Sequence, residues 1–380
     1  MQESIFKTFS MRWNLFLLFF VLSLSCFSQD PYLFIGTYTN GASKGIYVYR
    51  FNTSTGTGSE VSTILAANPS YLSISPDGKH VYAASENEKG GSALSYAFEP
   101  STGQLSFLNS QSAKGTCTCY ITEDKTGRWV FVANYCSGNL AGFPVNSDGS
   151  LAPAIQDIQQ FGKGPDTARQ ESSHMHSAIF SPDEKFLFAA NLGTDQEHIY
   201  AFNPSQHIPL TEPYDSMVFL KPGTGPRHIA FNPKKPEVYV LGELSGTIDG
   251  FHYDSASGKL RHFQRIRTTP ISFTGDPGSA DIHIRADGKF LYASNRGTSN
   301  TLAVFAIHND GKLISRQIVS VKGKHPRNFV IDPTGHFLLV ANRDTNNIVI
   351  FSIDQVTGLL KATGKEISIP SPVCLKFLTP

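Results

Sequence analysis

One unit recurs along this chain, and the recurrence constrains the fold more than any other feature. Each copy reads as a short apolar strand, a turn rich in Asp, Gly or Pro, a second apolar strand and then a small residue or asparagine. Apolar residues alternate with a period of two in both strands, which predicts a β-hairpin in every copy. Full copies are SYLSISPDGKHVYAASE from Ser70, CYITEDKTGRWVFVANY from Cys119, HSAIFSPDEKFLFAANL from His176, RHIAFNPKKPEVYVLGE from Arg227, ADIHIRADGKFLYASNR from Ala280 and RNFVIDPTGHFLLVANR from Arg327.

The spacing of the copies indicates how many strands each unit holds. A third strand follows each hairpin, as in Thr301 to Ile307 or Ile348 to Asp354, and a fourth, weaker strand follows a further turn. Four strands in about fifty residues are typical of one blade of a β-propeller. The small or asparagine position that ends the second strand recurs seven times, at Gly36, Ser85, Asn134, Asn191, Gly242, Asn295 and Asn342.

The two ends of the chain complete the count. YLFIGT (Tyr32 to Thr37) matches the second strand of the unit, and PVCLKFL (Pro372 to Leu378) matches the first strand. Neither segment has its own hairpin partner, so the two predict one shared blade and leave no open sheet edge. We therefore predict an all-β fold: a seven-bladed β-propeller of four-stranded blades over residues 29–380, closed by pairing of the N- and C-terminal strands.

Charge and composition narrow the class of partner. Basic and acidic side chains are nearly equal in number, 32 against 31, which argues against a nucleic-acid partner because such a protein needs a basic excess on one face. The 32 glycines and 22 prolines, with 28 Phe and 14 Tyr, are typical of an all-β protein with many turns.

The N-terminus differs from the repeats. Lys7 and Arg12 precede the apolar run WNLFLLFFVLSLSCFSQ, which is too short for a membrane span of about 20 residues. The pattern predicts a signal peptide over residues 1–28, cleaved after Ser28, and export to the periplasm or the cell exterior without a membrane span. Translation from Met11 and lipid attachment at Cys26 are alternatives at this end.

Four cysteines remain after such a cleavage: Cys117, Cys119, Cys136 and Cys374. An exported protein can pair them, although Cys117 and Cys119 are too close in sequence to favour a bond with each other. Cys374 lies inside an apolar strand, where a buried free thiol is an equal alternative. Their spacing does not fit a zinc site.

The repeat also predicts where functional side chains gather. Because the two strands of a hairpin are antiparallel, the start of the first lies beside the end of the second, and all blades present this end to one mouth of the channel. The first-strand starts are Ser70, Cys119, His176, Arg227, Ala280, Arg327 and Val373. The positions after the second strand are Thr37, Glu86, Tyr135, Leu192, Glu243, Arg296 and Arg343.

This rim carries charged and titratable residues that blade architecture does not require. The candidate catalytic residues are His176, Glu243, Arg227 and Arg296, and the candidate substrate-binding residues are His174, His228, Asp281, Arg327 and Arg343. The alternative is a solvated ion-pair network at a wet channel end. The turn aspartates Asp77, Asp287 and Asp310 suit hairpin geometry and need no metal, and His80, His198, His207 and His336 are expected at the surface.

Several segments resemble those of one known family. ARQESSHMHSAIFSPD, GPRHIAFNP, GELS and ASNRG are its specific motifs, within a resemblance that runs from FIGTYTNGASKGIYVYRFN to HPRNFVIDPTGHFLLVAN. The family is the seven-bladed lactonases, typified by bacterial 6-phosphogluconolactonase of the cycloisomerase-2 type and the fungal 3-carboxy-cis,cis-muconate lactonizing enzyme. The resemblance implies a lactone-processing site at the propeller mouth built from His176, Arg227, Glu243 and Arg296.

The predicted function is hydrolysis of a small anionic sugar-acid lactone. Glu243 or His176 can take a proton from water, and Arg227 and Arg296 can bind a carboxylate or phosphate and meet developing negative charge. We expect no metal or other cofactor. A second class of propeller lactonase holds Ca²⁺ with carboxylate and asparagine oxygens, but the repeated asparagines are expected to close strand ends instead. The alternative function is an exported propeller that binds a sugar acid or a protein partner without turnover.

Overall fold

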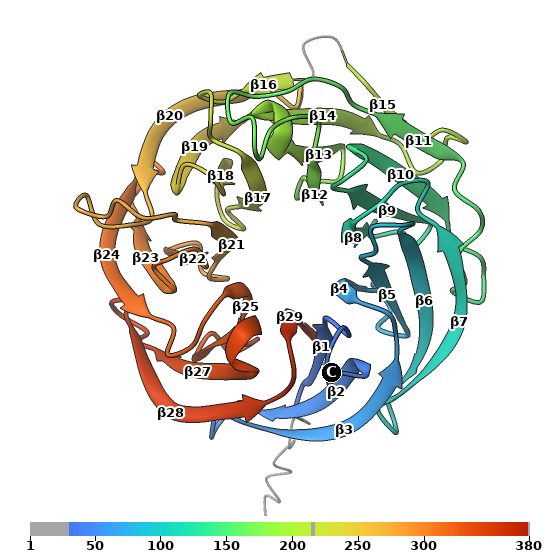
Figure 1. The fold of residues 1–380 in the computed structure, drawn as a ribbon, viewed down its shortest axis with the longest axis horizontal. Coiled ribbons are helices and arrows are strands. Elements are labelled where there is room, and N and C mark those ends of the chain that lie inside the picture. The colour runs from blue at the N-terminus through green and yellow to red at the C-terminus, as the bar shows by residue number, and fades with distance from the viewer. Residues whose placement is uncertain (1–29, 214–216, 379–380) are drawn as a thin grey trace, which may run out of the picture.

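The alternating apolar residues of each copy form antiparallel strand pairs, and seven such sheets form a ring (Figure 1). The computed structural model describes residues 30–213 and 217–378. Each sheet is a blade whose first strand lies nearest the ring axis. The seven-bladed propeller predicted from the repeats is confirmed.

The inner two strands of each blade are the predicted hairpin. The innermost strands are β4 (Pro69–Ile74), β8 (Thr118–Glu123), β12 (Met175–Phe180), β17 (Pro226–Phe231), β21 (Ser279–Ile284), β25 (Pro326–Ile331) and β29 (Pro372–Leu378). The second strands are β1 (Tyr32–Thr37), β5 (His80–Ser85), β9 (Trp129–Asn134), β13 (Phe186–Asn191), β18 (Glu237–Gly242), β22 (Phe290–Asn295) and β26 (Phe337–Asn342).

The outer strands complete the blades. The third strands are β2 (Gly45–Asn52), β6 (Ser92–Glu99), β10 (Asn139–Pro144), β14 (Gln196–Phe202), β19 (Thr247–Tyr253), β23 (Thr301–Ile307) and β27 (Asn347–Ile353). The outermost are β3 (Thr57–Leu65), β7 (Gln104–Ser112), β11 (Gln156–Gln159), β15 (Leu210–Thr211) with β16 (Met217–Phe219), β20 (Leu260–Arg267), β24 (Leu313–Ser320) and β28 (Leu360–Ser368). Two 3-10 turns, Leu192–Thr194 and Arg343–Thr345, follow β13 and β26.

The ring closes through its two terminal strands, as predicted. β29 pairs antiparallel with β1, from Tyr32 opposite Leu378 to Thr37 opposite Pro372. Figure 1 shows this junction, where the red end of the chain meets the blue beginning. The closing blade therefore consists of one strand from the C-terminus and three from the N-terminus.

The core lies between neighbouring blades, and a repeated contact fixes their spacing. Tyr82, Tyr239 and Tyr292 hold the same place on the second strands β5, β18 and β22, and all are fully buried. Each donates its hydroxyl to a glycine carbonyl oxygen in the outer turn of the next blade, at Gly149 (3.1 Å), Gly311 (2.6 Å) and Gly358 (3.0 Å), respectively. A buried Tyr hydroxyl requires such a partner, so these bonds link three of the seven blades to the blade that follows each.

Some predictions fall outside this description or are wrong. The signal peptide, its cleavage after Ser28 and the alternative at Cys26 lie outside the described residues. His198, expected at the surface, is buried with 4% exposure, because β16 pairs beside it and its ring stacks on Tyr200.

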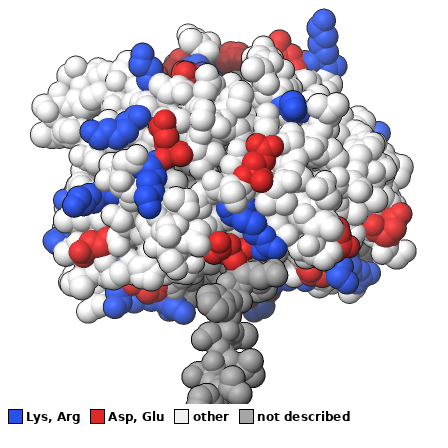
Figure 2. Space-filling model, turned by 90° about the horizontal axis from the view of Figure 1, so that it is seen from below, with Lys and Arg blue, Asp and Glu red and all other residues white. Residues whose placement is uncertain are grey.

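The described residues contain no helix long and apolar enough to cross a membrane. Figure 2 shows basic and acidic side chains interspersed over one side of the ring, in keeping with their equal numbers.

Candidate active site

The innermost strands share an irregularity that aims side chains at the ring axis. In β12 the pairing with β13 skips one residue between Met175 and Ser177, so His176 has no partner opposite it. Equivalent shifts lie at Ser70, Cys119, Arg227 and Arg327, and in β21 both Ala280 and Asp281 are skipped. A β-bulge re-aims its extra residue, so the predicted first-strand positions are the bulge positions of the blades.

Glu243 follows β18 and lies at the centre of a cluster of guanidinium groups. It is 2% exposed, and its carboxylate contacts Arg296 Nη2 at 2.5 Å, Arg227 Nε at 2.9 Å and Arg169 Nη2 at 2.6 Å. Burial by itself raises the pKa of Glu243, but the three arginines outweigh burial and hold the pKa well below its ordinary value. Glu243 is therefore a permanent carboxylate that organises the surrounding arginines.

Arg227 connects this cluster to a deeper polar network. The side chain is 1% exposed, and besides Glu243 it donates to the carbonyl oxygen of Ala280 and, at 3.2 Å, to His228 Nε2. His228 Nδ1 in turn donates to Asp281 Oδ1 at 2.8 Å, which fixes the imidazole tautomer. Burial is the main cause that lowers the pKa of His228 to about 4, so the ring is neutral.

Asp281 is the acceptor at the base of this network. His283 Nε2 donates to its Oδ2 at 2.9 Å, and Asn328 Nδ2 and the Phe329 amide donate to the same oxygen. Burial alone raises the pKa of Asp281, yet His283 and His228 hold it well below its ordinary value. A carboxylate with so many donors is occupied, so Asp281 positions His228 and has little capacity left for a substrate.

His176 keeps an unused ring nitrogen, a feature that it shares with His325. The residue is 4% exposed, and its Nδ1 has no hydrogen-bond partner within the described chain. Its ring lies edge-on to Tyr135 and His228, with centroid distances of 5.6 and 5.5 Å. Burial, followed by the charge of Arg227, lowers the pKa of His176 well below its ordinary value, so the imidazole is a neutral acceptor.

A loop outside the repeat contributes a further arginine. Arg169 precedes β12 and reaches Glu243, while its side chain stays 43% exposed. It also donates to the hydroxyl of Tyr135 at 3.4 Å. His174 stacks on Tyr135 at 4.4 Å and hydrogen-bonds the carbonyl oxygen of Tyr135 and the carboxylate of Glu171. His174 thus holds Tyr135 in place under Arg169.

These groups surround a cavity of about 490 Å³, here called the mouth cavity. It is lined by Arg169, Glu243, Asp276, Gly278, Arg296, Gly297, Thr298, His325, Arg327 and Arg343. Four arginines face two carboxylates there, which favours an anionic ligand. Of the predicted site residues, the lining includes Glu243, Arg296, Arg327 and Arg343, whereas His174, His176, Arg227, His228 and Asp281 lie outside it.

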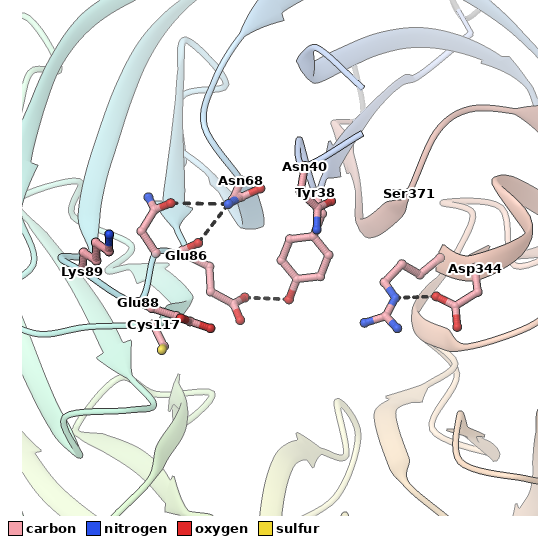
Figure 3. A pocket seen from close by; sticks show the side chains of 11 residues that line it. Tyr38, Asn40, Asn68, Glu86, Glu88, Lys89, Cys117, Asp344 and Ser371 are labelled. Carbon is pink, nitrogen blue, oxygen red and sulfur yellow. Dashed lines mark hydrogen bonds and ion pairs between the residues drawn. The ribbon is translucent and has the colours of Figure 1, made fainter. Parts of the chain in front are cut away.

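A second cavity of about 760 Å³ adjoins the first (Figure 3). Tyr38 and Glu86 face its interior, joined by a hydrogen bond of 2.8 Å from the tyrosine hydroxyl. Arg343 lines both cavities and is paired with Asp344 at 2.6 Å. Further lining residues are Asn40, Asn68, Asn87, Glu88, Lys89, Cys117 and Ser371.

The repeated asparagines close strand ends, as expected. Asn134 and Asn295 are fully buried, and each side chain donates to a backbone carbonyl oxygen of the preceding connection, at Ala113 (2.8 Å) and Thr268 (3.1 Å). Their side-chain oxygens accept from Thr118 and Ser279, both at 2.6 Å. Their amide groups are therefore already used.

Two site residues were missed by reasoning from the repeat. Arg169 lies in the insertion between β11 and β12, which has no counterpart in other blades and so no aligned position. The spacing of 57 residues between Asn134 and Asn191 was a signal that this blade carries extra chain. His325, which lines the mouth cavity, precedes the aligned Arg327 by two residues and has a left-handed backbone at φ 60°.

The fold and the mouth together define a class: propeller proteins with an arginine-rich site at one end of the ring. Within that class the chain belongs to the family described as "Lactonase, 7-bladed beta-propeller", whose model matches residues 32–377. The resemblance seen in the motifs is thereby confirmed.

Relatives and solved structures agree with this assignment. The chain is 37% identical over 349 residues to a 6-phosphogluconolactonase of Bacillus subtilis, covering 91% of this chain and 97% of the relative. It is 34% identical to a 6-phosphogluconolactonase of Formosa agariphila, covering 91% and 99%. The crystal structure of a periplasmic gluconolactonase of Pseudomonas aeruginosa superposes with a TM-score of 0.88 at 35% identity, covering 92% and 99%.

Proposed function

We propose that this chain hydrolyses a small anionic sugar-acid lactone in the mouth cavity. Family membership and the named relatives support lactone hydrolysis, a reaction of carboxylic-ester hydrolases. The observation that carries the location is the excess of arginine over carboxylate around the mouth cavity. Arg296, Arg327 and Arg343 offer paired N–H donors to a phosphate or carboxylate.

The arginines also serve the reaction itself. Attack on a lactone carbonyl places negative charge on its oxygen, and fixed donors stabilise that charge in the transition state. Arg296 and Arg169 are held at Glu243 before a substrate arrives. Glu243 therefore acts as a positioning residue that keeps the guanidinium groups in place.

His176 is the proposed general base. Both oxygens of Glu243 are engaged by arginine, so neither is free to accept a proton from water. His176 is neutral and its Nδ1 is free of partners in the described chain. Since His176 does not line the mouth cavity, a bridging water relays the proton to it. A bound anion offsets the arginine charge that lowers the pKa of His176 and so makes it a better base.

The test measures hydrolysis of 6-phosphoglucono-1,5-lactone and glucono-1,5-lactone, with the spontaneous rate subtracted. His176→Gln should lower kcat by roughly 10²–10⁴-fold, the contribution of a positioned base. His198→Gln is the matched control, because His198 is equally buried but lies on the third strand β14. Full activity in His176→Gln would remove it as the base. Saturable binding without hydrolysis by the unaltered protein would support the alternative of a binding propeller.

We also propose that the chain is exported. The sequence pattern of residues 1–28 supports this, as does the disulfide between Cys117 and Cys136, a bond typical of oxidising compartments. The Pseudomonas aeruginosa protein of similar structure is periplasmic. N-terminal sequencing of the protein from its host should begin near Gln29, and an intact Met1 or Met11 would contradict export.

A further inference from the structure

The two cavities at the mouth share a lining residue and are joined by an ion pair. Arg343 lines both, and Arg327 of the mouth cavity donates to Glu86 of the second cavity at 3.2 Å. Figure 3 shows Glu86 and Tyr38 facing the open space, with Asp344 across from them. A ligand held by the arginines of the mouth cavity therefore has room to extend past Arg343.

The second cavity differs from the mouth cavity in charge. Its acidic residues are Glu86, Glu88 and Asp344, and its basic residues are Lys89 and Arg343. Arg343 is already paired with Asp344, and Glu86 with Arg327. What remains is a nearly neutral wall of amide, hydroxyl and carboxylate groups, which does not select an anion.

The chemistry of this wall suits sugar hydroxyl groups. An amide side chain both donates and accepts, as a hydroxyl group does, and Asn40, Asn68 and Asn87 all line the cavity. Within the described chain, the side chains of Asn40, Glu88 and Lys89 make no hydrogen bond or ion pair, so they are available to a ligand. A volume of about 760 Å³ lies within the range of small-molecule sites.

We propose that the second cavity is a subsite for a neutral, polyhydroxylated unit, so that the preferred lactones carry a further sugar ring. The lactone and its anionic group occupy the mouth cavity, and the additional ring lies against Asn40, Glu88 and Lys89. This inference rests on the proposed lactonase function, because it names the substrate class of that same site.

The first experiment compares cellobiono-1,5-lactone with glucono-1,5-lactone on the full mature protein. Neither lactone carries an anionic group, so the comparison isolates the second ring. The ratio of kcat/KM for the two lactones should be at least 10 in favour of the larger one. Asn40→Trp, which fills the subsite with an indole ring, should bring the ratio close to 1. Asn309→Trp, at an exposed turn between β23 and β24 that lines neither cavity, is the matched control and should leave the ratio unchanged.

A second measurement separates this proposal from the proposed function. Calorimetric titration with cellobionate and gluconate, the ring-opened acids, requires no turnover and should show at least 10-fold tighter binding of cellobionate. Equal binding of the two acids together with a kcat/KM ratio near 1 would overturn the subsite while leaving lactone hydrolysis intact. Tighter cellobionate binding without hydrolysis of either lactone or of 6-phosphoglucono-1,5-lactone would instead reject the proposed function and retain the subsite.

Discussion

Two arcs of the ring carry different side chains at the same backbone feature, the β-bulge of each innermost strand. At the bulge positions of β29, β4 and β8, one arc carries uncharged side chains, namely Val373, Ser70 and Cys119. The other arc, from β12 to β25, carries His176, Arg227, Asp281 and Arg327. The backbone does not distinguish the arcs, because the bulge recurs in all seven blades.

This difference shows how a symmetric fold acquires an asymmetric site. The uncharged arc holds the closure between β29 and β1 and the disulfide between Cys117 and Cys136. Tyr71 and Tyr120 stack at 4.1 Å on the same side. We infer that the contacts that close and cross-link the ring are concentrated on this arc and the buried charges of the site on the charged arc, and four predictions test that division.

The largest effect is expected from breaking the closure. Deletion of residues 372–380 removes β29 and exposes the edge of β1, whose partner it is along its whole length. The shortened protein should be insoluble or should lose most of its free energy of unfolding. Thermal unfolding at the temperature of the full chain would show that the ring does not depend on its terminal strands.

Arg227→Met should cost both stability and activity on the charged arc. The change removes one of the three arginines that pair with the buried Glu243 and takes the donor from the Ala280 carbonyl oxygen, which costs roughly 1.5–3 kcal/mol in the free energy of unfolding. Ser70→Ala, at the equivalent bulge of the uncharged arc, should cost less than about 1 kcal/mol. Urea unfolding of both variants gives the comparison, and equal losses would contradict the division of the arcs.

Of the four cysteines, only the pair that forms the disulfide on the uncharged arc should contribute a cross-link to stability. The cross-link between Cys117 and Cys136 spans 19 residues, so the double change to Ser should lower the free energy of unfolding by about 3 kcal/mol. Cys119 and Cys374 are buried free thiols and should react with an alkylating reagent after unfolding. Mass spectrometry showing any other pairing would overturn this assignment.

The last effect concerns pH and the network of the charged arc. The pKa of His228 falls from 6.5 to about 4 on folding, so between these values the unfolded chain binds more protons than the folded one. Stability should therefore decrease as pH falls from 6.5 to 4, by up to about 1.4 kcal/mol per pH unit from this group. His228→Gln should reduce that slope, whereas His207→Gln, at an exposed position, should not. Equal slopes in the two variants would exclude His228 as the source.

Much of this architecture followed from the sequence because it depends on local patterns. Alternation with a period of two and repeated Asp-Gly turns define hairpins, and antiparallel pairing places Arg227 beside the segment that follows Glu237–Gly242. The unmatched segments at the two ends identified the closing blade in the same way. Glu243, Arg296, Arg327 and Arg343 line one cavity. The repeat brings them together because the start of a first strand lies beside the end of its antiparallel partner.

Other features were decided by the tertiary structure. Arg169 comes from an insertion without repeat equivalents, so contact with Glu243 depends on how that loop folds over the mouth. The choice of Cys136 as the partner of Cys117 and the burial of His198 under β16 are likewise set by packing. The choice of the proposed general base also depends on the tertiary structure, because the sequence gives no reason to prefer His176 over Glu243. The three guanidinium groups around Glu243 favour His176 in our proposal, because they come from distant parts of the chain and together engage both carboxylate oxygens.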